Sequence, residues 1–131
     1  MDGAEFGQGW DGPWYRVRRA GFTAVFLPDP GEPLAELCNV DVEVRLAADG
    51  SRWSATVFTH AEVGRLMERW ARTGEELGGR YFWCSDGLIV RDAGIDGMIA
   101  VLEGLYASGE LTTVLQRLDE GDEGNGDGGE A

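Results

Sequence analysis

Residues 40–70 constrain the fold of this chain most, because a hairpin signal there runs directly into a helix signal. Asp49-Gly50 favours a two-residue hairpin turn, in which both positions need a positive φ. Centring the turn on this dipeptide predicts an antiparallel pair with one apolar and one mostly polar face. The predicted pairs on the apolar face are Leu46–Trp53, Val44–Ala55, Val42–Val57 and Val40–Thr59. On the polar face they are Arg45–Ser54, Glu43–Thr56 and Asp41–Phe58.

The helix that follows is defined at both ends. Thr59 and Glu62 have the spacing of a capping box, in which the hydroxyl and the carboxylate satisfy free backbone donors. Gly74 is a natural terminator. Between them the apolar residues recur at helical spacing and predict one buried stripe, formed by Val63, Leu66, Met67 and Trp70.

Further elements are predicted on both sides. Residues 14–17 and 22–27 read as strands, and Asp86-Gly87 predicts a second hairpin over residues 80–92. Its predicted pairs are Ser85–Leu88, Cys84–Ile89, Trp83–Val90 and Phe82–Arg91. A second helix, capped by Asp92 or Asp96, carries the stripe Ile95, Met98, Ile99, Leu102, Leu105 and Tyr106. Residues 111–118 predict a short third helix, with a strand as the alternative.

The order β-β-β-β-α-β-β-α-α predicts an α+β fold, an antiparallel sheet built from hairpins with two or three helices packed on it. We expect three regions along the 131 residues. Residues 1–12 are expected to be a flexible, acidic, glycine-rich arm, residues 13–118 a single domain, and residues 119–131 a disordered acidic tail.

The formal net charge is −13, and its placement matters. Residues 119–131 hold six acids and no base, whereas residues 13–118 hold fifteen acids against eleven bases. A mildly acidic domain argues against nucleic-acid binding, which needs a basic surface, and allows attraction to a basic protein. All the bases are arginines, as in a GC-rich, for example actinobacterial, genome.

No residue pattern predicts a cofactor or a metal site. Cys38 and Cys84 are too few for a structural metal centre, and the chain lacks an apolar run long enough for a membrane span. The first residues lack a signal-peptide pattern, so we expect a cytoplasmic protein with no membrane partner. His60 and Cys84 are the only candidates for a small enzyme.

Surface aromatics beside acids are typical of protein interfaces, where aromatics supply contact area and acids steer a basic partner. The candidate partner-binding residues are Asp41, Glu43, Trp53, Trp70, Tyr81 and Asp86. They predict a non-enzymatic binding protein. A self-associating module, such as a dimer through the edge of the first hairpin, is the alternative.

The second half also resembles a group of known proteins. The resemblance rests on Gly74, Gly79-Arg80-Tyr81-Phe82-Trp83, Leu88-Ile89-Val90, Ile99, Leu102 and Gly109-Glu110-Leu111. This pattern is similar to that of small acidic α+β bacterial proteins, including immunity proteins of polymorphic toxin systems. The resemblance implies an immunity or antitoxin-type inhibitor, which binds a toxin-like partner without catalysis.

Overall fold

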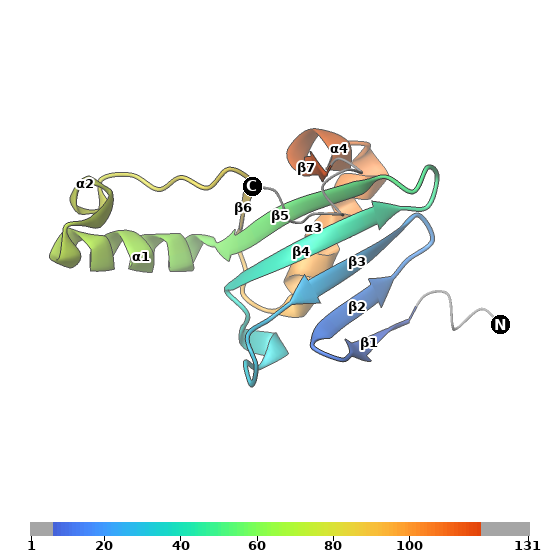
Figure 1. The fold of residues 1–131 in the computed structure, drawn as a ribbon, viewed down its shortest axis with the longest axis horizontal. Helices are drawn as coiled ribbons and strands as arrows, with labels where there is room; N and C mark the ends of the chain where they lie inside the picture. The colour runs from blue at the N-terminus through green and yellow to red at the C-terminus, as the bar shows by residue number, and fades with distance from the viewer. Residues whose placement is uncertain (1–6, 119–131) are drawn as a thin grey trace.

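The computed structural model of the chain describes residues 7–118, which form one seven-stranded mixed sheet with helices (Figure 1). The strands are β1 (Gln8–Asp11), β2 (Trp14–Arg18), β3 (Phe22–Leu27), β4 (Asn39–Leu46), β5 (Arg52–Thr59), β6 (Gly87–Val90) and β7 (Gln116–Leu118). The helices are the 3-10 turn η2 (Leu34–Glu36), α1 (His60–Thr73), α2 (Glu75–Gly79), α3 (Ile95–Ser108) and α4 (Leu111–Val114). The predicted α+β class is confirmed.

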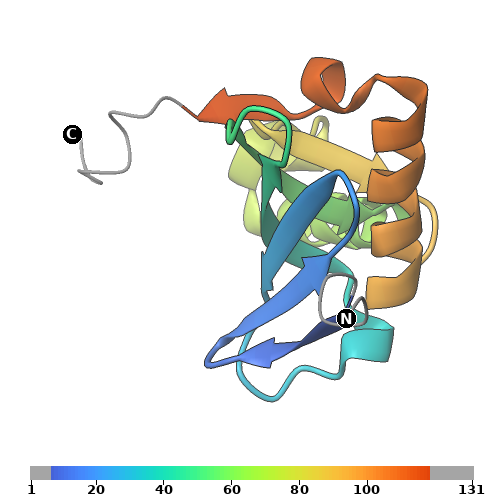
Figure 2. The ribbon, with the colours of Figure 1, turned by 90° about the vertical axis from the view of Figure 1, so that its right-hand side faces the viewer.

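One face of the sheet carries the hydrophobic core. Strands β1 to β6 lie side by side in chain order, and β7 pairs with β5 beside β6. Figure 2 shows α3 running along this face, and no helix within residues 7–118 covers the opposite face. The core lies on one face because every second side chain along the strands is apolar and points to that face. The core side chains include Val17, Phe22, Ala24, Phe26, Val42, Val44, Ala55 and Val57 from the sheet, and Ile95, Met98, Ile99 and Leu102 from α3.

The β4–β5 hairpin forms, but its register differs from the prediction by two residues. Val44 lies opposite Trp53, Val42 opposite Ala55 and Val40 opposite Val57. The connection is longer than two residues because only Gly50 adopts a positive φ, of 72°. Asp49 instead accepts hydrogen bonds from the amide and hydroxyl of Ser51, at 2.9 and 2.7 Å. A two-residue shift keeps each side chain on its predicted face, since the strand period is two.

The second predicted hairpin does not form. Only its second half is a strand, β6, and β6 runs parallel to β5 with Val57 opposite Leu88. Residues 80–86, which we call the return segment, have no strand structure. Phe82 in this segment packs on Phe58 and Trp70 instead of entering a ladder. An Asp-Gly dipeptide is compatible with a strand entry as well as a hairpin, and here it leads into β6, which pairs with β5.

Helix α1 begins and ends as predicted. The hydroxyl of Thr59 accepts the amide of Glu62 at 3.0 Å, and Gly74 ends the helix with a φ of 89°. The reciprocal half of the capping box is absent, because the amide of Thr59 donates to the carbonyl of Cys38. The Glu62 carboxylate instead accepts a two-pronged hydrogen bond from Arg65, at 2.6 and 2.8 Å.

Three other predictions are refined by the structure. Gly94, not Asp92 or Asp96, precedes α3, and its amide donates to the carbonyl of Leu37 at 2.8 Å. Residues 111–118 form both predicted alternatives in turn, α4 and then β7. Part of the expected flexible arm, Gln8–Asp11, is strand β1, paired with β2. Residues 1–6 of the predicted N-terminal region and the predicted tail, 119–131, lie outside the described residues.

We expect the Glu62→Gln variant to be less stable than the wild type by about 1–2 kcal/mol at pH 7. The Arg65 hydrogen bonds hold the pKa of Glu62 below its ordinary value, although burial opposes them. This stabilisation is complete above the unfolded-state pKa of ~4.3 and is lost as the pH falls through the folded-state pKa. The difference between the two proteins should therefore shrink in acid, as measured by urea unfolding at several pH values.

Glu68→Gln is the matched control, since Glu68 lies exposed on the same helix. We expect this variant to stay within about 0.5 kcal/mol of the wild type. A Glu62→Gln protein that keeps the full acid sensitivity of the wild type would contradict the assigned role of this pair.

Candidate protein-binding face

The uncovered side of the sheet, which we call the open face, is the candidate functional site. Its side chains alternate with the buried core residues along four strands, so their orientation follows from the pleat. They are mainly charged or hydroxyl-bearing, and the two signs of charge are segregated. The open face consists of Trp14, Arg16, Arg18, Thr23, Val25, Leu27, Asp41, Glu43, Arg45, Arg52, Ser54 and Thr56, with Asp86 at the entry to β6.

Two carboxylates define the acidic half of the open face. Thr56 lies between Asp41 and Asp86, and its hydroxyl oxygen is 2.9 Å from one carboxylate and 3.1 Å from the other. One hydroxyl hydrogen can serve only one of them at a time. Ser54 lies 3.3 Å from the second oxygen of Asp86. Within residues 7–118 neither aspartate forms an ion pair, whereas Glu43 binds Arg52 at 3.0 Å.

The acidic half is also a shallow hollow with an apolar wall. A depression of about 350 Å³ is lined by these carboxylates and hydroxyls and by Trp14, Val25 and Leu27. Trp14 and Leu27 are 42% and 40% exposed, so their side chains are available for contact. The hollow combines negative charge with apolar surface, which suits the aliphatic stem and charged head of lysine or arginine.

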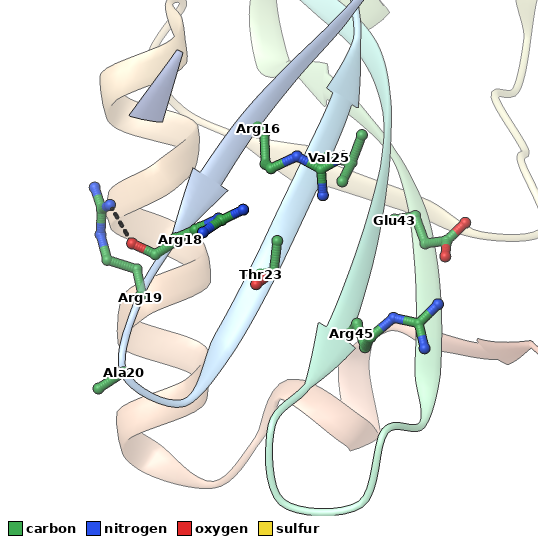
Figure 3. A pocket seen from close by; sticks show the side chains of 8 residues that line it. All are labelled: Arg16, Arg18, Arg19, Ala20, Thr23, Val25, Glu43 and Arg45. Atoms are coloured by element: carbon green, nitrogen blue, oxygen red, sulfur yellow. Dashed lines mark hydrogen bonds between the residues drawn. The ribbon is translucent and has the colours of Figure 1, made fainter. Parts of the chain in front are cut away.

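The basic half lies beside it, toward the β2–β3 and β4–β5 turns. Figure 3 shows Arg16, Arg18 and Arg45 with Thr23 and Val25, all projecting from the side of the sheet turned away from α3. A hollow of about 650 Å³ lies among them, lined by four arginines and one acid, Glu43. The boundary between the halves is the Glu43–Arg52 ion pair.

The six predicted partner-binding residues fall in three places. Asp41, Glu43 and Asp86 come together on the open face, although the prediction drew them from two separate hairpins. Trp53 is 8% exposed and lies in the core, on the apolar face of β5 where the strand alternation already placed it. Trp70 and Tyr81 lie on a projecting unit described next.

Helix α1, α2 and the return segment form an arm that extends from the end of β5 beyond the sheet (Figure 1). Phe82 joins it to the sheet, since its ring is 4.8 Å from that of Phe58 and stacks at 6.0 Å on Trp70. The predicted α1 stripe is half-buried and lies outside the main core, and Trp70 within it packs on Phe82 of the return segment. The Tyr81 hydroxyl donates to Glu76, and this hydrogen bond raises the pKa of Tyr81.

The tip of the arm is strained and apolar. Glu76 and Leu77 adopt left-handed φ values of 50° and 55°, which cost a non-glycine residue roughly 1–2 kcal/mol each. Leu77 at the tip is 72% exposed, and Trp83 in the return segment is 76% exposed. Strained and exposed apolar positions of this kind concentrate at contact sites.

Cys84 and His60, the candidates for a small enzyme, lie in the return segment and at the start of α1. The thiol of Cys84 lies 3.6 Å from the carboxylate of Asp86, and His60 is exposed at the start of α1. Cys38 contacts Glu62 at 3.6 Å, and burial together with this carboxylate raises the pKa of the Cys38 thiol. The described part of the chain contains no cluster of histidine, cysteine and acidic residues able to hold a metal ion. None of its helices is long and apolar enough to cross a membrane.

Sequence reasoning missed the arginines of the open face. Arg16 and Arg18 alternate with Tyr15 and Val17 in strand β2, and this alternation already indicated an outward basic row. Arg45 lies on β4, and it joins this row because β3 pairs with both β2 and β4. The sequence does not show that pairing. Trp14 is the first residue of β2, and the strand pattern does not show whether a side chain at that position is exposed.

Comparison with known proteins gives no relative. No protein-family model, no curated protein and no solved structure matches this chain.

We expect Gly79→Ala to destabilise the arm, lowering the unfolding free energy by about 2 kcal/mol. Gly79 has a φ of 79°, and a Cβ there would overlap the backbone carbonyl of Met67 in α1. A backbone atom cannot move aside as a flexible side chain can. Urea unfolding followed by tryptophan fluorescence reports the change, since Trp70 lies in the arm.

Gly64→Ala on α1 is the matched control, because a Cβ there meets nothing within 4 Å. In a helix interior this change should stabilise by up to about 1 kcal/mol. Equal effects of the two substitutions would show that α2 does not depend on close packing against α1.

Proposed function

We propose that this chain is a non-enzymatic protein-binding module whose acidic half-face holds a basic side chain of its partner. One observation carries the proposal. Asp41 and Asp86 flank a single hydroxyl, without an ion pair among residues 7–118, in an apolar-walled hollow on a sheet face that no described helix covers. Two partly satisfied carboxylates so placed favour a cation between them.

An arginine or lysine of a partner fits this hollow by shape and by charge. The charged head would donate hydrogen bonds to the carboxylates of Asp41 and Asp86, and the stem would lie along Trp14 and Leu27. An aromatic wall adds a cation–π contribution of about 0.5–2 kcal/mol. The hydroxyls of Ser54 and Thr56 can reorient to serve the remaining carboxylate oxygens.

The biological role that these features support is inhibition of a basic, toxin-like protein by occlusion. The negative net charge accelerates association with a basic partner, as expected of an immunity protein. The resemblance of the second half to bacterial immunity proteins supports the same role. We place the protein in the cytoplasm, where the thiols of Cys38 and Cys84 stay reduced.

Affinity capture from a lysate of the native host tests the proposal. Wild-type protein should recover a basic protein that the Asp41→Asn/Asp86→Asn double variant recovers at least about tenfold less well, because the loss of two charge-assisted contacts exceeds 1.4 kcal/mol. Quantitative mass spectrometry gives the ratio. The purified partner should lose its own activity when one equivalent of wild-type chain is added.

Asp29→Asn/Glu36→Gln is the matched control, since it removes the same charge from exposed positions outside the open face. It should recover the partner as the wild type does. The proposal fails if recovery is unaffected by the Asp41 and Asp86 substitutions, or if the recovered protein keeps full activity in the presence of the chain.

Self-association is the alternative, and the arm favours it. The predicted route through the edge of the β4–β5 hairpin is closed, because β4 pairs with β3 and β5 with β6 and β7. The exposed Leu77 and Trp83 at the arm offer a different contact between two copies.

Under this alternative, light scattering at high micromolar concentration should show a dimer that the Leu77→Ser/Trp83→Ser variant does not form. Val114→Ser is the control, since Val114 is also an exposed apolar residue but lies on α4. A wild-type mass equal to one chain at every concentration would rule the alternative out.

A further inference from the structure

A row of arginines crosses the open face and ends where the described chain ends. Arg18 lies opposite Thr23, Thr23 opposite Arg45, and Arg45 opposite Arg52. Arg52 lies opposite Leu118, the last residue of β7. Directly opposed residues of neighbouring strands share a face, so the three arginines project from the open face beside Leu118.

The row forms the floor of a positive surface. Arg18 and Arg45 line the hollow of about 650 Å³ together with Arg16 and Arg19, against one acid. Arg16 binds Asp11 at 2.7 Å and Arg19 binds Glu103 at 2.6 Å. Arg45 is exposed and forms no ion pair with any residue in the range 7–118. Within the row Arg52 binds Glu43 at 3.0 Å, so the row places three arginines beside one acid on a chain whose formal net charge is −13.

The residues that follow Leu118 have the opposite composition. Residues 119–131 contain six acids and no base, and the first two, Asp119 and Glu120, come directly after β7. Four strand spacings separate β7 from β2, a distance of roughly 19 Å. Thirteen residues span up to about 45 Å when extended, so the segment can reach every arginine of the row.

We infer that residues 119–131 dock on the arginine row of the open face. A tethered segment meets its site at an effective concentration in the millimolar range, so several weak charge pairs suffice to hold it there. An external polyanion such as a nucleic acid lacks this advantage and is repelled by the acidic chain as a whole. The docked segment would cover the basic half and leave the acidic half free. This inference does not depend on the partner proposed above.

The test compares the full-length wild type with a full-length variant whose terminal acids are neutralised. The substitutions are Asp119→Asn, Glu120→Gln, Asp122→Asn, Glu123→Gln, Asp127→Asn and Glu130→Gln. NMR signals of the Thr23 amide and of the Arg18 and Arg45 side chains should differ between the two proteins at about 0.02 M NaCl. The difference should disappear at about 0.5 M NaCl, where screening acts within a few ångströms. Signals of Arg69 and Arg72, which lie on α1, should not change.

A second pair of variants separates docking from a general charge effect. In an Arg18→Gln/Arg45→Gln background, neutralising the terminal acids should no longer alter the Thr23 signal. In an Arg69→Gln/Arg72→Gln background, which removes the same charge from the arm, the alteration should persist unchanged. Identical open-face spectra before and after neutralisation, or equal changes at Arg69 and Thr23, would overturn the inference. Failure of partner capture would leave these spectra unaffected, so the two proposals are tested separately.

Discussion

The rest of the structure depends on the two-residue alternation of β2 to β5 against a single covering helix. Burial of Val17, Ala24, Val44 and their neighbours under α3 fixes which side of the sheet is apolar. The pleat then places every intervening side chain on the other side, where residues 7–118 supply no second layer. The open face is therefore a consequence of the core. A sheet buried on both faces would need apolar residues where this chain has arginine, aspartate and threonine.

Both proposals made above depend on the segregation of charge on that face. A random mixture of arginines and acids would form ion pairs and present little field. Here one pair, Glu43–Arg52, lies on the boundary, with Asp41 and Asp86 on one side and Arg45 on the other. Two adjacent half-faces of opposite sign can hold two different occupants at once. A basic partner and an acidic segment would then bind without competing for the same groups.

The arm shows how a helix outside the main core is kept folded. Its anchor is a compact group at the end of β5, in which Thr59 caps α1 and Glu62 joins Cys38 to Arg65. Phe82 adds a second contact by packing between Phe58 and Trp70. Only about one side of α1 is covered, so the arm should open more easily than the sheet.

The sequence alone determined the local features, because these depend on residues a few positions apart. The Thr59 cap, the Gly74 end and the sorting of side chains on β4 and β5 were predicted correctly, as were the first four residues of the α3 stripe; its last residue, Tyr106, is 43% exposed. Tertiary structure decided the register of that hairpin and the parallel pairing of β6. Local patterns repeat every two residues, so they cannot distinguish registers that differ by two. They also cannot show which distant strand borders a segment, and that proximity is what joined Asp41 to Asp86 and Arg18 to Arg45.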